Sequence, residues 1–351
     1  MTIVENTSAF QDDHLIAPVT DLRELALAAA APAALRAAIR AGLADAIGDT
    51  PVPIAELATK LQVDAGVLER LLRNLGCYGV FAATEQGVAH TPTSALLRED
   101  HPNSLKHWVL WVTEPWTWEL WPHLDQALRE GGQGLFEGLH SGTEFFAHLH
   151  QQWPESTEVF NRSQTELSQI MSATIAHTLD LRDVTSIADV GGGRGYNLAT
   201  LLEHNPHLHG VLVDLPAVVA NPDPRLRPGG ALADRAQVLA GNCLEGIPAQ
   251  VDVYLFKSIL EWDDERTVTA LRNAAKAGRP GGRVLVITNL VDDSPEIRYA
   301  TGIDLLFLLN TNGKRHTMAG VSKLIERAGL RFEGVSPIKP LLHLVEATIP
   351  Q

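Results

Sequence analysis

The first part of the chain repeats apolar residues at the spacing of a helix. Residues 21–47 therefore form one predicted helix. Its face carries an apolar residue at every fourth position: Leu35, Ile39, Leu43 and Ile47. Pro32 interrupts the pattern, and a proline inside a helix removes a backbone hydrogen bond and kinks or splits the helix. Residues 1–18 lack this periodicity and are expected to form a flexible tail.

A second helix with an apolar stripe follows Asp64, which is a favourable N-cap residue. The stripe consists of Val67, Leu68, Leu71, Leu72 and Leu75. Two short extended runs around a turn at residues 85–87 then predict a hairpin. Helix, helix and hairpin in this order are typical of a winged helix. Because the second helix carries few basic residues, we interpret the module as a dimerisation or packing element, not a DNA-binding one.

Residues 104–177 are predicted to be helical and hold six of the seven tryptophans. These are Trp108, Trp111, Trp116, Trp118, Trp121 and Trp153. Two interpretations are open: the rings pack a core, or some of them form the flat apolar wall of a pocket for an aromatic substrate. The candidate substrate-lining residues are Trp111, Trp116, Phe160 and Met171.

From residue 186 onward, predicted strands alternate with predicted helices. The strands are residues 187–190, 210–214, 237–240, 251–256 and 282–287, with two late strands near Phe332 and at 342–347. The helices are residues 196–204, 263–277 and 317–329. This alternation indicates an α/β fold with a doubly wound, Rossmann-like sheet. We expect three parts: the tail (1–18), a mainly α winged-helix and substrate-lining domain (19–170), and a Rossmann-like catalytic domain (171–351).

Charge and composition narrow the class of protein. The 351 residues include 28 Lys and Arg against 42 Asp and Glu, so the net charge is 28 − 42 = −14. An acidic protein of this kind is a poor partner for nucleic acid or an anionic membrane surface. The longest apolar stretch, residues 25–35, is about 11 residues long, short of the roughly 20 that span a bilayer. The polar N-terminus has no signal-peptide pattern, so we expect a cytoplasmic protein.

The cysteines and histidines do not predict a metal site. Cys77 and Cys243 form no CxxC pair and stand beside apolar or small residues, which indicates two reduced, buried thiols. His148, His150 and the histidines of residues 204–209 lack acidic partners in a ligand arrangement, so no bound metal is expected.

The candidate chemistry lies in the turn after the first strand of the α/β region, Asp189-Val-Gly-Gly-Gly-Arg-Gly195. In a doubly wound sheet, ligands bind outside the carboxyl ends of the strands, and glycines let the backbone approach them closely. Asp214, at the end of the next strand, can accept hydrogen bonds from both hydroxyls of a ribose. Asp189 would repel a pyrophosphate but can hold the ammonium of a methionine moiety. The pattern therefore favours S-adenosylmethionine (SAM) over a dinucleotide.

Several motifs occur in order along the chain: Asp189-Val-Gly-Gly-Gly-Arg-Gly195, Val213-Asp-Leu-Pro216, Gly241-Asn242, Lys257-Ser-Ile-Leu-Glu-Trp262 and Arg279-Pro-Gly-Gly282. Together with the winged-helix module, they resemble the small-molecule SAM-dependent O-methyltransferases, the group of plant caffeate and flavonoid enzymes and bacterial antibiotic-tailoring enzymes. The resemblance covers residues from about 25 to 348. It implies a homodimer with interlocked N-terminal helices and a catalytic domain that converts SAM to S-adenosylhomocysteine (SAH).

The resemblance also assigns single residues to the cofactor site. Gly191, Gly193 and Asp214 match SAM-binding positions. Asn242 stands where the family usually has an Asp that contacts adenine, and Lys257 matches a lysine near the cofactor. The candidate cofactor-binding residues are Asp189, Gly191, Gly193, Asp214, Leu215, Asn242, Cys243, Lys257 and Trp262.

The catalytic motif departs from the family pattern. The family reads Lys-x-x-x-His-Asp-Trp, in which the His is the general base for a phenol. Between Lys257 and Trp262 this chain is one residue shorter and has no histidine. Glu261 takes the His position when residues are counted from Lys257, and Leu260 takes it when they are counted back from Trp262.

The two supporting glutamates of the family are also replaced, the first by Thr288 or Asn289 and the second by Arg315. Three interpretations are open. Glu261 is the general base; or the enzyme works by proximity and orientation without a strong base; or the scaffold has changed chemistry. The third includes C-methylation, and hydroxylation, decarboxylation or cyclisation with SAM kept bound. A solvated charge before a helix is the simplest alternative for Glu261.

His316 is a second candidate catalytic base, because it follows a loop that borders the substrate in the family; an exposed loop histidine is the alternative. Asn310 matches a substrate-contact position. We therefore predict a SAM-dependent methyltransferase for a small, aromatic acceptor, with oxygen favoured over carbon or nitrogen.

Overall fold

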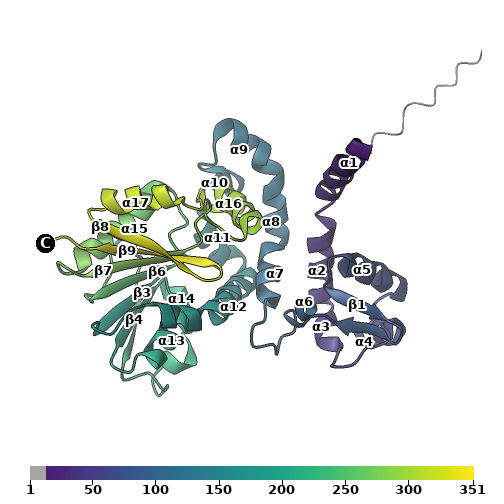
Figure 1. The fold of residues 1–351 in the computed structure, drawn as a ribbon, viewed down its shortest axis with the longest axis horizontal. Helices are drawn as coiled ribbons and strands as arrows, with labels where there is room; N and C mark the ends of the chain where they lie inside the picture. Colours follow the sequence, from purple (N-terminus) through teal and green to yellow (C-terminus); the bar gives the residue numbers. More distant parts are fainter. Residues whose placement is uncertain (1–12) are drawn as a thin grey trace, which may run out of the picture. The chain divides into compact units, whose positions relative to one another are not determined.

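The computed structural model describes residues 13–351, with side chains from Ile16 onward. The expected tail at residues 1–18 falls mostly outside this range, and its described part belongs to helix α1 (Asp13–Ala26). The chain divides into two compact units between Thr113 and Glu114 (Figure 1). No described helix is long and apolar enough to cross a membrane.

The first unit is mainly helical. Its further helices are α2 (Ala30–Arg40), α3 (Leu43–Ala46), α4 (Ile54–Leu61), α5 (Ala65–Cys77), α6 (Pro92–Ala95) and α7 (Lys106–Val112). Strands β1 (Phe81–Thr84) and β2 (Gly87–His90) form the predicted antiparallel hairpin. The Asp64 side chain accepts a hydrogen bond from the Val67 amide at 2.8 Å, which confirms the predicted N-cap of α5.

The helix predicted over residues 21–47 is three helices. The first ends at Ala26 and the next begins at Ala30, so Pro32 stands in the first turn of α2, where a missing backbone N–H is tolerated. Gly42, with a φ of +72°, separates α2 from α3. The apolar positions nevertheless reach one core: Ile39, Leu43 and Ile47 are buried.

The second unit begins with helices. They are α8 (Pro115–Leu120), the 3-10 helix η1 (Trp121–His123), α9 (Leu124–Glu130), α10 (Leu135–Leu139), α11 (Phe145–Gln152) and the long α12 (Pro154–Thr178). The helices of the α/β region are α13 (Tyr196–His204), α14 (Pro216–Val219), η2 (Pro224–Leu226), α15 (Asp264–Ala277), α16 (Ile297–Thr311) and α17 (Met318–Arg327).

A seven-stranded sheet in the order β5-β4-β3-β6-β7-β9-β8 forms the centre of this unit. Its strands are β3 (Ser186–Val190), β4 (His209–Asp214), β5 (Ala236–Ala240), β6 (Val253–Lys257), β7 (Arg283–Thr288), β8 (Arg331–Ile338) and β9 (Leu342–Thr348). The strands from β5 to β7 are parallel, and β9 is antiparallel to both β7 and β8. The strand order reverses between β3 and β6, which is where such sheets bind ligands. The predicted α/β class is confirmed.

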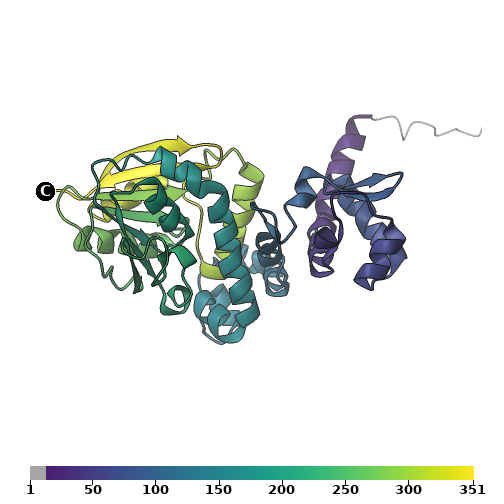
Figure 2. The same ribbon diagram turned by 90° about the horizontal axis from the view of Figure 1, so that it is seen from below.

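Alternate side chains of the strands enter two cores on opposite faces of the sheet. On β6, Tyr254 and Phe256 join the core formed with α15 and α17, whereas Val253 and Leu255 join the core formed with α12 and α13. Figure 2 shows the helices on both sides of the sheet. Burial on both faces explains why these strands are continuous apolar runs in the sequence. It also leaves the carboxyl ends of β3, β4 and β6 as the place where polar side chains gather.

We expect Gly195→Ala to destabilise the protein more than Gly229→Ala. Both glycines have a positive φ, +85° and +81°, so an alanine costs about 1–2 kcal/mol in backbone strain at either position. At Gly195 the new Cβ would also stand 2.5 Å from Leu226 Cδ1 and 2.9 Å from Leu212 Cδ2, whereas nothing lies within 4 Å at Gly229. This overpacking adds about 1–3 kcal/mol, measurable by denaturant unfolding. Equal losses in the two variants would contradict the proposed packing.

Candidate active site

The glycine turn follows β3 and packs closely against two neighbours. Gly191 and Gly193 have φ values of +67° and +62°, a region that side chains rarely adopt. A Cβ at Gly191 would collide with Ile259, and one at Gly192 would stand 2.7 Å from the carboxyl carbon of Asp189. Only glycines allow the turn to lie this close to both β3 and the loop after β6.

Asp214, at the carboxyl end of β4, fixes the turn from the other side. Its Oδ2 accepts a hydrogen bond from the Gly193 amide at 2.8 Å, and its Oδ1 accepts one from the Leu215 amide at 2.7 Å. Burial raises the pKa of this carboxyl group to about 6, against the lowering effect of the two amides. A carboxylate oxygen can accept more than one hydrogen bond, so both oxygens remain available to ribose hydroxyls.

Asp189 is fully buried at the end of β3. Its Oδ2 lies 3.5 Å from the Asn197 amide nitrogen, and its Oδ1 has no hydrogen-bond partner among the described residues. Burial raises its pKa to about 6, and the positive charge of Lys257 opposes that shift. An unpartnered buried carboxylate oxygen beside a glycine turn fits an ammonium group of a ligand, which supplies the missing donor.

Lys257 ends β6, and the backbone bends at the next residue. Ser258 takes a left-handed conformation, with a φ of +53°, while its amide donates to the Ile287 carbonyl at 2.8 Å. Burial lowers the pKa of Lys257, and the negative charges of Asp189 and Glu261 oppose this. Lys257 is therefore in electrostatic reach of both carboxylates.

Glu261 and Arg315 form a nearly buried ion pair. Glu261 Oε1 and Arg315 Nη1 are 3.3 Å apart, and the two side chains are 11% and 8% exposed. Arg315 Nη1 also donates to the Asn289 carbonyl at 3.4 Å, and the guanidinium lies over the Phe307 ring at 5.6 Å. The two residues are 54 positions apart in the sequence, and both differ from the family pattern. The simple alternative for Glu261, a solvated charge, is wrong because the side chain is nearly buried.

The loop that carries Arg315 is held against the Glu261 loop. The Arg315 amide donates to Asp304 Oδ1 at 2.5 Å, and a Cβ at Gly313 would collide with the Glu261 carbonyl. The close approach of these two loops places the guanidinium beside the carboxylate.

Comparison with known proteins identifies the family to which the chain belongs. A profile of the O-methyltransferase domain matches residues 121–331, and a profile of the O-methyltransferase dimerisation domain matches residues 23–100. The chain belongs to the O-methyltransferase family. Members of this family use SAM, so the predicted family and cofactor are both confirmed, and the chain is a SAM-dependent methyltransferase.

Three known proteins illustrate the similarity. The mitomycin biosynthesis 6-O-methyltransferase of Streptomyces lavendulae is 32% identical over 314 residues, covering 87% of this chain and 88% of that protein. The 8-amino-8-demethylriboflavin N,N-dimethyltransferase of Streptomyces davaonensis is 28% identical and covers 89% and 90%. The crystal structure of NcsB1, an O-methyltransferase from neocarzinostatin biosynthesis in complex with SAH and 1,4-dihydroxy-2-naphthoic acid, is 30% identical, with a TM-score of 0.75 and coverage of 91% and 96%.

Other candidate cofactor residues of the methyltransferase lie at the carboxyl end of β5 and beyond β6. Asn242 Oδ1 accepts from the Leu244 amide at 3.0 Å, and its Nδ2 donates to Glu245 at 3.1 Å, so its amide is held in a local turn. Cys243 is buried as predicted, which raises the pKa of its thiol to about 12 and keeps it protonated. Cys77, at the end of α5, is exposed, so the prediction that both thiols are buried is wrong for this residue. Trp262 is half-buried against the core that contains α15.

His316 is buried, so the alternative of an exposed loop histidine is wrong. Its Nε2 lies 2.8 Å from the Leu260 carbonyl, and burial lowers its pKa. A neutral imidazole with Nε2 donating to a carbonyl fits this contact. The ring therefore holds the loop of residues 258–262 in place.

The candidate substrate residues divide between the two units. Asn310 on α16 is buried and its Oδ1 has no partner among the described residues. Met171 and Phe160 lie on α12, buried and half-buried. Trp116 is buried on α8 and stacks on Trp153, with ring centroids 5.5 Å apart. Trp111 is buried on α7 of the first unit.

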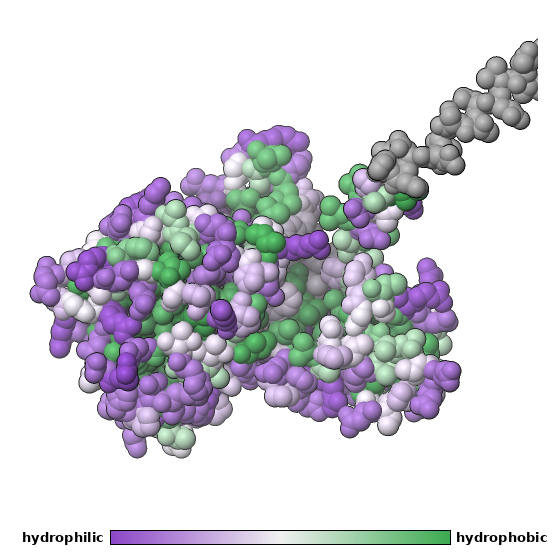
Figure 3. All heavy atoms as spheres, viewed as in Figure 1, coloured by the Kyte–Doolittle hydropathy of each residue, from purple (hydrophilic) through white to green (hydrophobic). Residues whose placement is uncertain are grey.

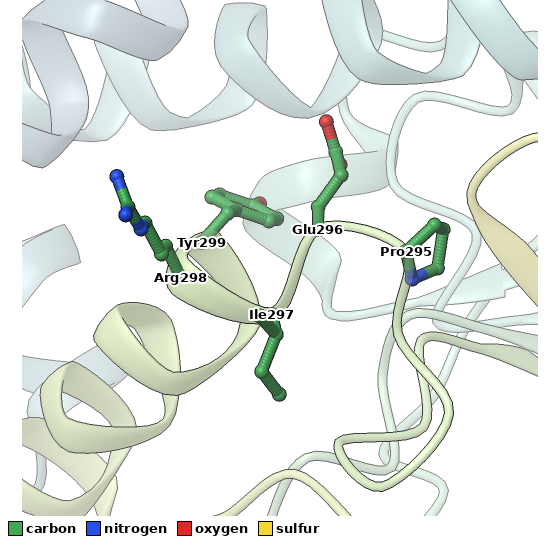
Figure 4. Close-up of a pocket in the computed structure, with 5 residues that line it drawn as sticks. All are labelled: Pro295, Glu296, Ile297, Arg298 and Tyr299. Carbon is green, nitrogen blue, oxygen red and sulfur yellow. The ribbon is translucent and has the colours of Figure 1, made fainter.

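A surface hollow of about 390 Å³ lies at the start of α16 (Figure 4). Five consecutive residues line it: Pro295, Glu296, Ile297, Arg298 and Tyr299. In Figure 4, Glu296, Arg298 and Tyr299 point to one side of the helix start and Ile297 to the other. None of the predicted site residues lines this hollow. In the part of the chain that the structure describes, no three histidine, cysteine, aspartate or glutamate residues are grouped to hold a metal ion.

We expect the affinity for SAH to fall as the pH drops below about 6. Asp214 and Asp189 have pKa values of about 6, and only their ionised forms accept hydrogen bonds at both oxygens from ribose and ammonium donors. Each proton that must leave for binding weakens the affinity by about tenfold per pH unit below its pKa. Calorimetry of SAH binding from pH 5 to 8 measures this. An Asp214→Asn variant should bind more weakly with a shallower pH dependence, and a pH-independent affinity in the native enzyme would contradict the assignment.

Proposed function

We propose that this methyltransferase transfers a methyl group from SAM to an oxygen of a small aromatic acceptor of the secondary-metabolite type. The observation that supports this most is the set of charged groups near the carboxyl end of the sheet. It consists of the buried Asp189 carboxylate with an unpartnered oxygen, the Asp214 carboxylate and the Glu261–Arg315 ion pair. One of the similar structures supports the aromatic acceptor, since it holds 1,4-dihydroxy-2-naphthoic acid, and the mitomycin enzyme supports oxygen as the methylated atom.

SAM, when bound, supplies a methyl group on a positively charged sulfur. Asp214 would accept hydrogen bonds from the ribose, and Asp189 would accept them from the methionine ammonium. Leu215, Asn242 and Cys243, at the ends of β4 and β5, would border the adenine. Lys257, at the end of β6, and Trp262, in the loop that follows, would border the cofactor on the side of that loop. Lys257 would partly balance the buried charge of Asp189.

Among the three interpretations of catalysis, we favour proximity and orientation. A proton transferred to Glu261 would break a nearly buried ion pair with Arg315 and leave the guanidinium without its carboxylate. Nε2 of His316 is engaged with the Leu260 carbonyl. Holding the acceptor in line with the methyl group can itself remove a large part of the barrier.

A nitrogen acceptor is the second candidate, because one relative is named as an N,N-dimethyltransferase. A neutral amine needs no base before it attacks, and this also agrees with the loss of the histidine. Carbon acceptors have no comparable support.

Methyl transfer to phenols is the expected result when the enzyme is incubated with labelled SAM and a panel of hydroxyarenes, arylamines and carbon acids. Labelled product with an O-methyl group supports the proposal; N-methyl product alone supports the second candidate. SAH binding without any methylated product would contradict both.

Glu261→Gln should retain methyl transfer within about tenfold of the native rate, because the amide removes a base but keeps the shape of the side chain. General-base catalysis contributes about 10²–10⁴-fold, so a loss of this size in kcat, with the disappearance of one limb of the pH profile, would instead assign the base role to Glu261. SAH affinity of the variant provides the control for folding.

We also propose that the enzyme is a homodimer joined through α1. Large apolar side chains of this helix are exposed although the dimerisation-domain match includes part of it: Ile16, Val19, Leu22 and Leu25. Hydrophobic residues reach the surface on α1 and α9 in Figure 3. An exposed apolar face of this kind marks an interaction surface.

Light scattering should give a mass of about twice the 38.1 kDa of one chain. Leu22→Asp should lower it to one chain, whereas Leu128→Asp on α9, a side chain that is 87% exposed against 68% for Leu22, should leave it unchanged. A dimer that survives Leu22→Asp would contradict the role of α1.

A further inference from the structure

Arg315 keeps donor capacity that the protein does not use. Its side chain is 8% exposed, yet only Nη1 contacts Glu261, at 3.3 Å, instead of the two parallel bonds of a bidentate pair. Nε is buried and has no hydrogen-bond partner among the described residues. A buried N–H without an acceptor costs about 1–3 kcal/mol, so this group fits a ligand that supplies one.

The charges around Arg315 favour a negative ligand. Glu261 is shared, because it pairs with Arg315 and also acts on Lys257. Asp189 acts on Lys257 from the other side and is the carboxylate assigned above to the cofactor ammonium. Glu261 is therefore shared between two cations, and a negative ligand beside Arg315 would supply a second anion to that guanidinium.

The neighbours of Arg315 restrict the shape of that ligand. Phe307 covers one face of the guanidinium, and the Asn289 carbonyl takes Nη1. The side-chain oxygen of Asn289 is also buried and unpartnered among the described residues. This oxygen accepts hydrogen bonds, so it suits a ligand that carries a donor elsewhere on its ring.

From these contacts we propose that Arg315 binds the acceptor as an oxyanion, and that the enzyme selects hydroxyl groups acidic enough to ionise in the site. Hydroxyquinones and phenols with a conjugated carbonyl group are the chemical class that fits. This inference rests on the proposed O-methylation and names the acceptor for it.

The reaction then balances without a protein base. The acceptor O–H loses its proton to water, and Arg315 stabilises the oxyanion. The oxyanion attacks the methyl carbon, an O–C bond forms, and the C–S bond breaks with its electron pair remaining on sulfur. The products are the methyl ether, neutral SAH and one proton in solution. Arg315 acts here as a substrate-binding and specificity residue.

The test compares two probes of similar shape: 2-hydroxy-1,4-naphthoquinone, which is ionised at neutral pH, and 2-naphthol, which is neutral. Calorimetry with the full chain saturated with SAH measures binding without turnover. The native enzyme should bind the ionised probe at least about tenfold more tightly, the effect expected of a charge-assisted hydrogen bond. Arg315→Gln should abolish this preference, and Arg315→Lys should keep part of it because the charge stays but the planar fork is lost.

Lys314→Gln is the matched control. Lys314 is the adjacent cation, but it is 47% exposed and pairs with Asp264, so its loss should leave the preference unchanged. Glu261→Gln removes the carboxylate that competes for Arg315 and should tighten binding of the ionised probe several-fold. If Arg315→Gln does not fold, the double variant Glu261→Gln/Arg315→Gln removes both charges together and should also show no preference.

Three outcomes would each overturn the proposal. The native enzyme binds both probes equally; or the preference for the ionised probe survives in Arg315→Gln or in the double variant; or Glu261→Gln binds the ionised probe more weakly than the native enzyme. Failure of this inference can be distinguished from failure of the proposed O-methylation. O-methyl product from neutral phenols alone would keep O-methylation and reject Arg315 as the selector. Anion preference without methyl product would reject O-methylation while Arg315 still binds anions.

Discussion

Four side chains of alternating charge link the glycine turn to the loop after α16: Asp189, Lys257, Glu261 and Arg315. Each charge is buried or largely buried, and a charge is stable there only when an opposite charge stands beside it. Lys257 interacts with both neighbouring carboxylates in this series. Burial disfavours its protonated form, and the two carboxylates favour it. The residues proposed to bind the cofactor and those proposed to face the acceptor are therefore coupled electrostatically.

Local sequence patterns predict most of the sheet and little of its surroundings. The strands at the site and helices α13, α15 and α17 begin and end within about two residues of their predicted bounds. Strands buried on both faces are continuous apolar runs in the sequence, and glycines mark the turns between elements. The helix α16 was not predicted. Its consecutive apolar residues around Leu305–Leu309 give no single stripe at helical spacing. This helix carries Asn310 and leads into the loop of Arg315.

The residues proposed to bind the cofactor can be placed from the sequence because their arrangement is local. The glycine turn, Asp189 and Asp214 are at strand ends whose neighbours the alternation predicts. The acceptor half is not local. Glu261 and Arg315 are separated by 54 residues and meet only because Ser258 turns the chain in a left-handed conformation and Gly313 lets the second loop approach. Considered separately, each residue departs from the family pattern. Their opposite charges are the one signal in the sequence that the two side chains pair with each other.

If Glu261 takes the place of the family histidine and Arg315 that of the second glutamate, a different group in the site carries the proton. A histidine supported by a glutamate is a neutral acceptor that becomes a cation after it takes the substrate proton. The Glu261–Arg315 pair already has its cation, and its carboxylate is occupied. The pair still joins the loop after β6 to the loop after α16. In the proposed mechanism this pair keeps its positioning role and accepts no proton. The acceptor hydroxyl itself must then be acidic, and a fixed guanidinium would increase that acidity by stabilising the oxyanion.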